Sequence, residues 1–202
     1  MDAYIVAGYR TAVGRGKRSV LKSVRPDDMA ADVIKHLVSQ IKDFDATRVD
    51  DLIVGNAVPE AEQGMQMGRM ISLLALPIQV PGMVVNRYCG SGLEAIALAS
   101  ARIHSGTADC IIAGGTESMS MVPVMGYKTA LNYKLATEYQ DYYLSMGLTA
   151  EQVAKEYKIS RDEADQFALE SHQKAIAAQQ AGKFTDEIVP IKVTEKFVDG
   201  SG

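Results

Sequence analysis

A strand passes directly into a helix across Val85-Asn-Arg-Tyr-Cys-Gly-Ser-Gly-Leu-Glu-Ala-Ile96. The apolar residues that end at Val85 are typical of a buried strand, and the alanine-rich sequence from Gly92 onward is typical of a helix. Cys89 stands in the short turn between them. A strand, a tight turn and a helix form one step of a β–α unit, so we expect the flanking sequence to repeat the alternation.

The flanking sequence does alternate between apolar runs and helical periodicity. Four strands and three helices are predicted, over residues 3–9 (strand), 26–41 (helix), 52–55 (strand), 64–76 (helix), 83–86 (strand), 92–104 (helix) and 110–115 (strand). This spacing implies βαβ units, and therefore an α/β fold with helices on a mostly parallel sheet. In the helix over 64–76, four apolar residues are expected to face the core: Met67, Met70, Ile71 and Leu74.

The pattern changes after Ser118. Residues 119–147 show little periodicity, which predicts an irregular excursion over a surface or cleft. Two further helices are then predicted, with capping boxes at Thr149-Ala-Glu-Gln152 and at Ser160-Arg-Asp-Glu163. Gly182 is placed to cap the end of the second helix.

Composition argues against several classes of protein. The net charge of -4 is unlike that of nucleic-acid-binding proteins, which usually have a basic face. No apolar run is long enough to span a bilayer, and no signal peptide is visible. Two cysteines are too few for a disulfide scaffold and, with three scattered histidines, form no zinc-binding pattern. We expect a cytoplasmic protein with reduced thiols, without a metal and without nucleic-acid or membrane partners.

Cys89 is the candidate for chemistry. A thiol at a helix N-terminus lies near backbone N–H groups and the positive end of the helix dipole, which favour the nucleophilic thiolate. Gly90 and Gly92 carry no side chains, so a substrate carbonyl can approach the backbone closely. The arrangement is similar to the nucleophile elbow of hydrolases. A small buried cysteine in a core turn explains these residues equally well.

Other residues have a structural and a functional interpretation as well. Gly114-Gly-Thr-Glu-Ser118 ends a strand, where ligands bind in open α/β sheets, but it also suits a tight turn. Met119 and Met146 can line a tunnel for an apolar substrate or form ordinary packing. Cys110 opens an apolar strand, so we expect a core residue whose thiol stays protonated.

Several segments resemble the thiolase family, in the order in which that family has them. Val85–Ala95 resembles the acyl-enzyme segment, and Gly114-Gly-Thr-Glu-Ser-Met-Ser120 resembles the glycine-rich turn that follows it. The other similar segments are Gly55-Asn-Ala57, Met146-Gly-Leu-Thr-Ala-Glu151, Ser160-Arg-Asp-Glu163 and Phe184-Thr-Asp-Glu-Ile-Val-Pro190. The resemblance is collinear from near Met1 to about Val193.

The resemblance implies a fold and an activity. Thiolases have two βαβαβαββ halves, so residues 1–118 would form most of the first half and residues 119–202 would begin the inserted, coenzyme A-binding loop domain. Cys89 would attack a 3-ketoacyl-CoA, release acetyl-CoA and pass the shortened acyl group to a second coenzyme A. Substrate would be bound by Gly90, Gly92, Met119 and Met146. Coenzyme A would be a co-substrate, not a permanently bound cofactor, and the full-length enzyme would be a homodimer or homotetramer.

The sequence departs from the family in what it lacks. Full thiolases are about twice as long, and their second half supplies an Asn-Glu-Ala-Phe segment, a Gly-His-Pro histidine and a Cys-x-Gly-Gly-Gly cysteine. None of these is present in this sequence. Since removing members of a catalytic unit usually abolishes most of the rate advantage, we expect little or no turnover by this chain alone.

Alternatives to this assignment remain. Short-chain biosynthetic thiolases often have histidine where this chain has Ser145, which favours a degradative enzyme of fatty acid β-oxidation over an acetoacetyl-CoA thiolase. Ketoacyl synthases share the fold and the cysteine, but the segment that begins at Met146 and the loop domain argue against them. A folded fragment without activity, or one half of a two-chain enzyme, is the alternative outside catalysis.

Overall fold

The computed structural model describes residues 2–194. Within residues 2–194 the chain divides into two compact units, one formed by the residues up to Tyr127 together with Glu187–Thr194, the other by Lys128–Asp186. Residues 119–127, which the sequence assigned to the second region, therefore belong to the first unit. None of the helices in the described part of the chain combines the length and the apolar character that a membrane span requires.

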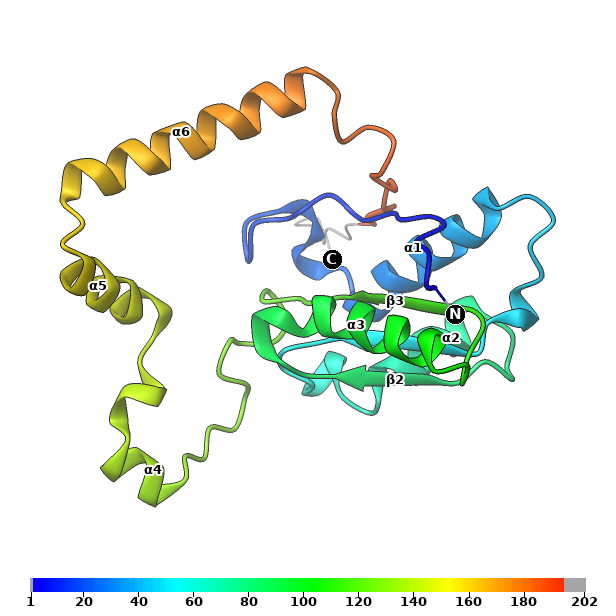
Figure 1. Ribbon diagram of the computed structural model, residues 1–202, viewed down its shortest axis with the longest axis horizontal. Helices are drawn as coiled ribbons and strands as arrows, with labels where there is room; N and C mark the ends of the chain where they lie inside the picture. The colour runs from blue at the N-terminus through cyan, green and yellow to red at the C-terminus, as the bar shows by residue number, and fades with distance from the viewer. Residues whose placement is uncertain (1, 195–202) are drawn as a thin grey trace, which may run out of the picture. The chain divides into compact units, whose positions relative to one another are not determined.

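A parallel sheet of three strands forms the centre of the first unit (Figure 1). The strands are β1 (Asp51–Gly55), β2 (Gly82–Val85) and β3 (Ile111–Gly115), in the order β2-β1-β3. Each lies within one residue or so of its predicted position, and both pairings are parallel. All five residues of β1 are buried, as expected for a central strand that is covered on both faces.

Two helices cover one face of the sheet. α1 (Pro26–Gln40) and α2 (Met67–Ala75) bury their apolar sides against Leu52 and Val54 of β1, with Ile71 in the same cluster. Pro26 is the first residue of α1, a position that tolerates proline because the first N–H groups of a helix have no intrahelical partner.

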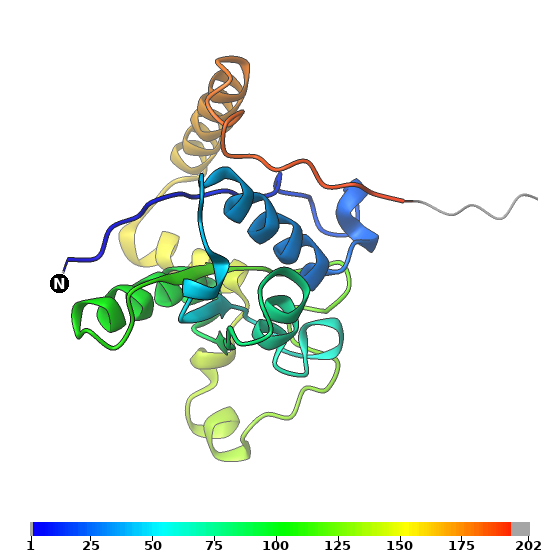
Figure 2. The same ribbon diagram turned by 90° about the vertical axis from the view of Figure 1, so that its right-hand side faces the viewer.

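The third helix covers the opposite face (Figure 2). α3 (Ser91–His104) packs Ala95 and Ala99 against Ile53, which points away from Leu52 and Val54 because side chains alternate along a strand. The expected α/β architecture, with helices on both faces of a parallel sheet, is confirmed.

The inward face of α2 differs from its prediction. Met67 and Ile71 are buried, but Met70 and Leu74 are 37% and 44% exposed, so the prediction for these two was wrong. The reason is a close approach of backbones, since a Cβ atom on Gly68 would lie 2.4 Å from the carbonyl oxygen of Met83. The side of the helix that carries Gly68 therefore meets β2, and Met70 and Leu74 turn away.

The strand predicted over residues 3–9 is not formed. Tyr4, Ile5 and Val6 are 79–86% exposed and have no regular secondary structure. A single parallel bridge joins Arg10 to Ile188. Apolar composition predicted a strand, but a strand also needs a neighbour for its N–H and C=O groups. The backbone bonds that Arg10 forms with Glu187 and Val189 provide such a neighbour only at the end of this segment.

The second unit contains three helices, α4 (Tyr133–Glu138), α5 (Met146–Tyr157) and α6 (Arg161–Gln180). The capping box predicted at Ser160 is confirmed, because Ser160 Oγ accepts the N–H of Glu163 and the Glu163 carboxylate accepts the N–H of Ser160. The box predicted at Thr149 was wrong. α5 begins one turn earlier, because Ser145 Oγ accepts the N–H of Leu148.

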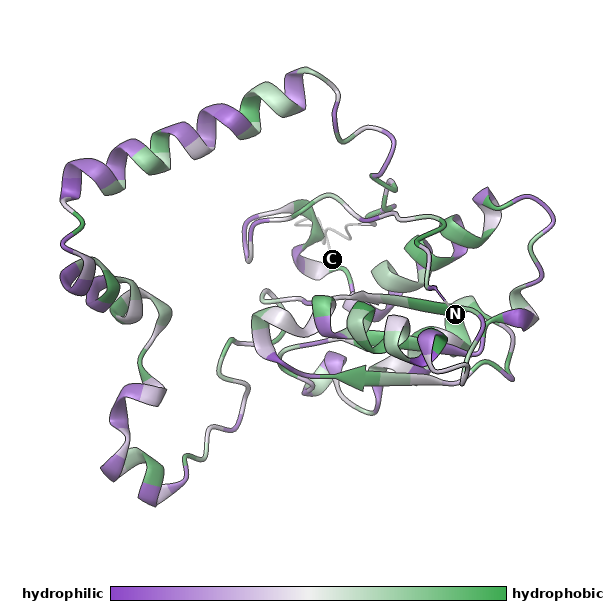
Figure 3. Cartoon of the chain, in the orientation of Figure 1, coloured by the Kyte–Doolittle hydropathy of each residue, from purple (hydrophilic) through white to green (hydrophobic). Residues whose placement is uncertain are grey.

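The long helix α6 is stabilised at its ends and not by burial. No residue of α6 is buried, and Figure 3 shows hydrophilic residues along most of its length. At its C-terminal end, the N–H of Lys183 donates to Ala178 O and the N–H of Gly182 donates to Gln179 O. These are the two bonds of a Schellman motif, and Gly182 has the positive φ of 67° that the motif requires. The prediction that Gly182 ends this helix is confirmed.

Candidate functional site

The carboxyl ends of the three strands meet at one edge of the sheet. The backbone N–H of Asn56 donates to Val85 O, and the N–H of Thr116 donates to Gly55 O, each at 3.1 Å. The loops that follow β1, β2 and β3 therefore begin side by side. In open α/β sheets this edge is where ligands bind.

Cys89 lies at this edge, in the turn that joins β2 to α3. The turn is a short 3-10 helix, Tyr88–Gly90, and α3 begins with the next residue, Ser91. The Cys89 side chain is exposed, so the interpretation as a buried core cysteine was wrong. The structure places this thiol beside the N-terminal end of a 14-residue helix, where the positive end of the helix dipole favours a negative charge.

Hydrogen bonds hold the backbone of this turn on both sides of Tyr88. The Asn86 side chain accepts the N–H of Tyr88 at 2.8 Å. The hydroxyl of Ser91, a buried residue, accepts the N–H of Arg87 at 2.9 Å and donates to Tyr88 O at 2.6 Å. Tyr88 itself has a φ of 48°, which non-glycine residues rarely adopt and which costs about 1–3 kcal/mol unless its surroundings enforce it.

A buried glutamine connects the loops that follow β1 and β3. The Gln63 side chain donates to Val58 O at 2.8 Å and to Glu117 Oε1 at 2.6 Å, and its oxygen accepts the N–H of Ser118 at 2.6 Å. The second oxygen of Glu117 accepts the N–H of Ala57 at 2.6 Å. Sequence reasoning missed Gln63, because its partners lie far along the chain. The one signal in the sequence was Glu117, a carboxylate inside the glycine-rich turn that needs hydrogen-bond donors.

Packing does not explain the glycines beside Cys89. A Cβ on Gly92 would meet no atom within 4 Å, and one on Gly90 would only touch the Arg87 side chain at 3.9 Å. Gly55 is different, because a Cβ there would lie 2.5 Å from the backbone of Ser91. The space at Gly90 and Gly92 is compatible with a substrate that approaches the backbone, and their substrate-binding role stays a prediction.

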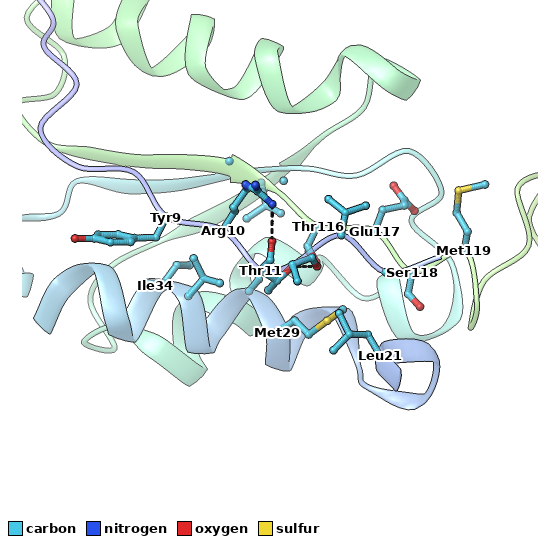
Figure 4. A pocket seen from close by; sticks show the side chains of 18 of the residues that line it. Tyr9, Arg10, Thr11, Leu21, Met29, Ile34, Thr116, Glu117, Ser118 and Met119 are labelled. Atoms are coloured by element: carbon cyan, nitrogen blue, oxygen red, sulfur yellow. Dashed lines mark hydrogen bonds between the residues drawn. The ribbon is translucent and has the colours of Figure 1, made fainter. Parts of the chain in front are cut away.

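The two predicted methionines lie in different compact units of the chain. Met119 is 54% exposed and lines a cavity of about 590 Å³ between α1, the sheet and the segment around Thr11 (Figure 4). Cys89 is not among the residues that line this cavity. Met146 begins α5 in the second unit and is 72% exposed.

Cys110 has the environment expected of an unreactive thiol. It is half-buried, and this burial raises the pKa of the thiol, as does the charge of Asp50. The Asp50 carboxylate accepts the N–H groups of Asp109 and Cys110 at 2.7 and 3.0 Å, and these two bonds lower the pKa of Asp50. Of the two cysteines, only Cys89 is both exposed and next to a helix N-terminus.

Comparison with known proteins agrees with this geometry. The family described as "Thiolase, N-terminal domain" matches residues 3–199. The chain is 52% identical, over 194 residues, to a 3-ketoacyl-CoA thiolase of Bacillus subtilis. It is 41% identical over 192 residues to proteins of the same name in Psychrobacter and Acinetobacter baumannii. These alignments cover 95–96% of this chain but 49% of each relative, so the chain spans about half the length of the curated relatives it matches.

Proposed function

Because this chain belongs to the thiolase family, we propose that it is the nucleophile-bearing part of a 3-ketoacyl-CoA thiolase. The observation that carries the proposal is the position of Cys89, exposed in a strand-to-helix turn, in a chain so similar to enzymes of that name. Coenzyme A acts as a co-substrate, and acyl-CoA is the other ligand.

The reaction assigned to Cys89 is a two-step acyl transfer. Its thiolate attacks the 3-keto carbonyl, and the bond between C2 and C3 breaks. The electron pair leaves on C2 as the enolate of acetyl-CoA, which takes up a proton. The shortened acyl group stays on sulfur as a thioester until the thiol of a second coenzyme A displaces it. The N–H groups at the start of α3 and the open space at Gly92 support this assignment.

The chain carries only part of the machinery for these steps. It contains neither the Gly-His-Pro nor the Cys-x-Gly-Gly-Gly segment of the family, so no residue here is assigned to activate the thiol or to protonate the enolate. We expect little or no turnover without residues supplied from outside this sequence.

The remaining assignments follow from the same proposal. The residues up to Tyr127 belong to the half that carries the nucleophile, and Lys128–Asp186 begin the coenzyme A-binding loop domain. Gly90, Gly92, Met119 and Met146 bind substrate. The complete enzyme is a cytoplasmic homo-oligomer that acts in β-oxidation. Exposed apolar side chains such as Ile5 and Val6 support packing against further protein, since large apolar patches usually mark interfaces.

A chimera tests the proposed activity. This chain replaces the matching half of the Bacillus subtilis relative, and thiolysis of a 3-ketoacyl-CoA by coenzyme A is measured. We expect activity that Cys89→Ala abolishes and Cys110→Ala preserves. A folded chimera that shows no thiolysis, or one that keeps its activity with Cys89→Ala, would refute the proposal.

A further inference from the structure

We propose that Gln63 and Glu117 are positioning residues for the turn that carries Cys89. They act through an unbroken chain of hydrogen bonds that leads from the protein core to the residue before the thiol. The inference rests on the proposed role of Cys89 and assigns the residues that set the geometry of its turn.

The chain of hydrogen bonds begins at Gln63, which is fully buried. Its amide donates to Glu117, and the other oxygen of Glu117 accepts the N–H of Ala57, both at 2.6 Å. The carbonyl oxygen of Ala57 accepts the side-chain amide of Asn86 at 3.0 Å. The side-chain oxygen of Asn86 then accepts the N–H of Tyr88 at 2.8 Å, which leads to the residue before Cys89.

This series of hydrogen bonds requires a carboxylate at position 117. Both oxygens of Glu117 accept a hydrogen bond, one from Gln63 and one from Ala57. Gln63 cannot turn over, because its oxygen accepts the N–H of Ser118 and its nitrogen also donates to Val58 O. Glu117→Gln would therefore place an NH₂ group against a donor in either orientation. Hydrogen bonds to a charged acceptor are also the stronger kind.

The backbone conformation of Tyr88 depends on hydrogen bonds and not on packing of its side chain. Tyr88 is 74% exposed, so side-chain packing does not hold its unusual φ of 48°. The polar contacts of its backbone are the bonds to Asn86 and Ser91. If Asn86 loses its fixed partner, the turn can relax and Cys89 moves away from the N–H groups at the start of α3.

Alkylation of the two cysteines tests the proposal without any coenzyme A substrate. The rates at which iodoacetamide modifies Cys89 and Cys110 are measured by peptide mass for the wild type and for Glu117→Gln. We expect a roughly three- to tenfold lower rate at Cys89, the factor that corresponds to one lost hydrogen bond, and an unchanged rate at Cys110. A role in folding alone would instead raise the rate at half-buried Cys110 and leave the rate at exposed Cys89 unchanged.

Exchanging the two side chains tests whether the alkylation rate at Cys89 can be restored. In Gln63→Glu combined with Glu117→Gln, the new carboxylate accepts from Ser118 and from the new amide, whose oxygen still accepts from Ala57. The bond to Val58 is lost and a carboxylate oxygen then faces Val58 O, so we expect the Cys89 rate to recover only in part. Glu151→Gln makes the same chemical change at an exposed position of α5 and should leave both rates unchanged.

The outcomes separate this proposal from the proposed function. An unchanged or faster Cys89 rate in folded Glu117→Gln, a parallel change at both cysteines, or a folded swap variant with no recovery at all would each overturn it. If Glu117→Gln does not fold, Asn86→Ala removes the last link at an exposed position, and the same selective loss at Cys89 is expected. A chimera that is active while alkylation is unaffected would refute the positioning role alone.

Discussion

Cys89 and Cys110 show how the position of a residue determines what a thiol can do. Cys89 is exposed at the start of a helix, whereas Cys110 is half-buried beside the carboxylate of Asp50, which favours the protonated thiol. The sequence predicted both environments, since one cysteine stands among glycines and the other in an apolar strand. In the sequence, Ser145 indicated only the class of substrate. The structure shows that it is also the N-cap of α5.

Asp50 gives a prediction at the same scale. Its pKa is lowered by the N–H groups of Asp109 and Cys110, so its charged form stabilises the fold above the ordinary carboxyl range, and this stabilisation is lost as the pH falls through the lowered pKa. Asp50→Asn should therefore lower the free energy of unfolding at neutral pH, with a difference from the wild type that shrinks in acid. Urea titrations at several pH values across this range measure the difference in the free energy of unfolding. A difference that does not change with pH would contradict the assignment.

Helices and strands are present where a local apolar pattern also finds a packing partner elsewhere in the chain. Three of the four predicted strands and all three early helices are present, because their apolar faces meet one another. Residues 3–9 are equally apolar but lack a paired neighbour, which the local pattern could not reveal. Gln63 escaped prediction for a related reason, because Glu117 and Ser118 lie 54 and 55 positions away from it.

The caps of α6 give a prediction for an element that no core supports. Ser160→Ala removes the acceptor of the capping box and should cost about 0.5–2 kcal/mol of local stability. Faster amide exchange in the first turn of α6 measures the effect. Ser171→Ala is the matched control, because it makes the same substitution at an exposed position in the middle of the helix, where alanine is favourable. Equal effects of the two substitutions would show that the box contributes nothing.

Two glycines near the junction of β1 and α3 are expected to respond differently to alanine. Gly55→Ala should destabilise the fold strongly, because its Cβ would lie 2.5 Å from the backbone of Ser91 and α3 would have to move. Gly92→Ala should preserve stability or add about 0.5–1 kcal/mol, since the space is open and alanine favours a helix. In the chimera, Gly92→Ala should nevertheless slow thiolysis. A fully active and stable Gly92→Ala protein would refute the role of this glycine in substrate binding.

At the scale of the whole molecule, the proposed function makes the chain one part of a larger catalytic unit. It provides the turn with Cys89 and a sheet edge on which three loops converge. Its alignments end at about half the length of each relative. The family relationship could be predicted from the sequence because several motifs occur in the correct order. The surroundings that complete the site could not, because the segments that supply them in the family are absent from this sequence.

The most direct test of the account is the intact mass of the chain after it is mixed with a 3-ketoacyl-CoA. The wild type and Cys110→Ala should gain the mass of the shortened acyl group when the second half of a relative is supplied, and Cys89→Ala should gain nothing. This result would establish Cys89 as the acyl carrier. An acyl group that remains on the protein in Cys89→Ala, or a wild type that is never acylated in the assembled enzyme, would contradict the account.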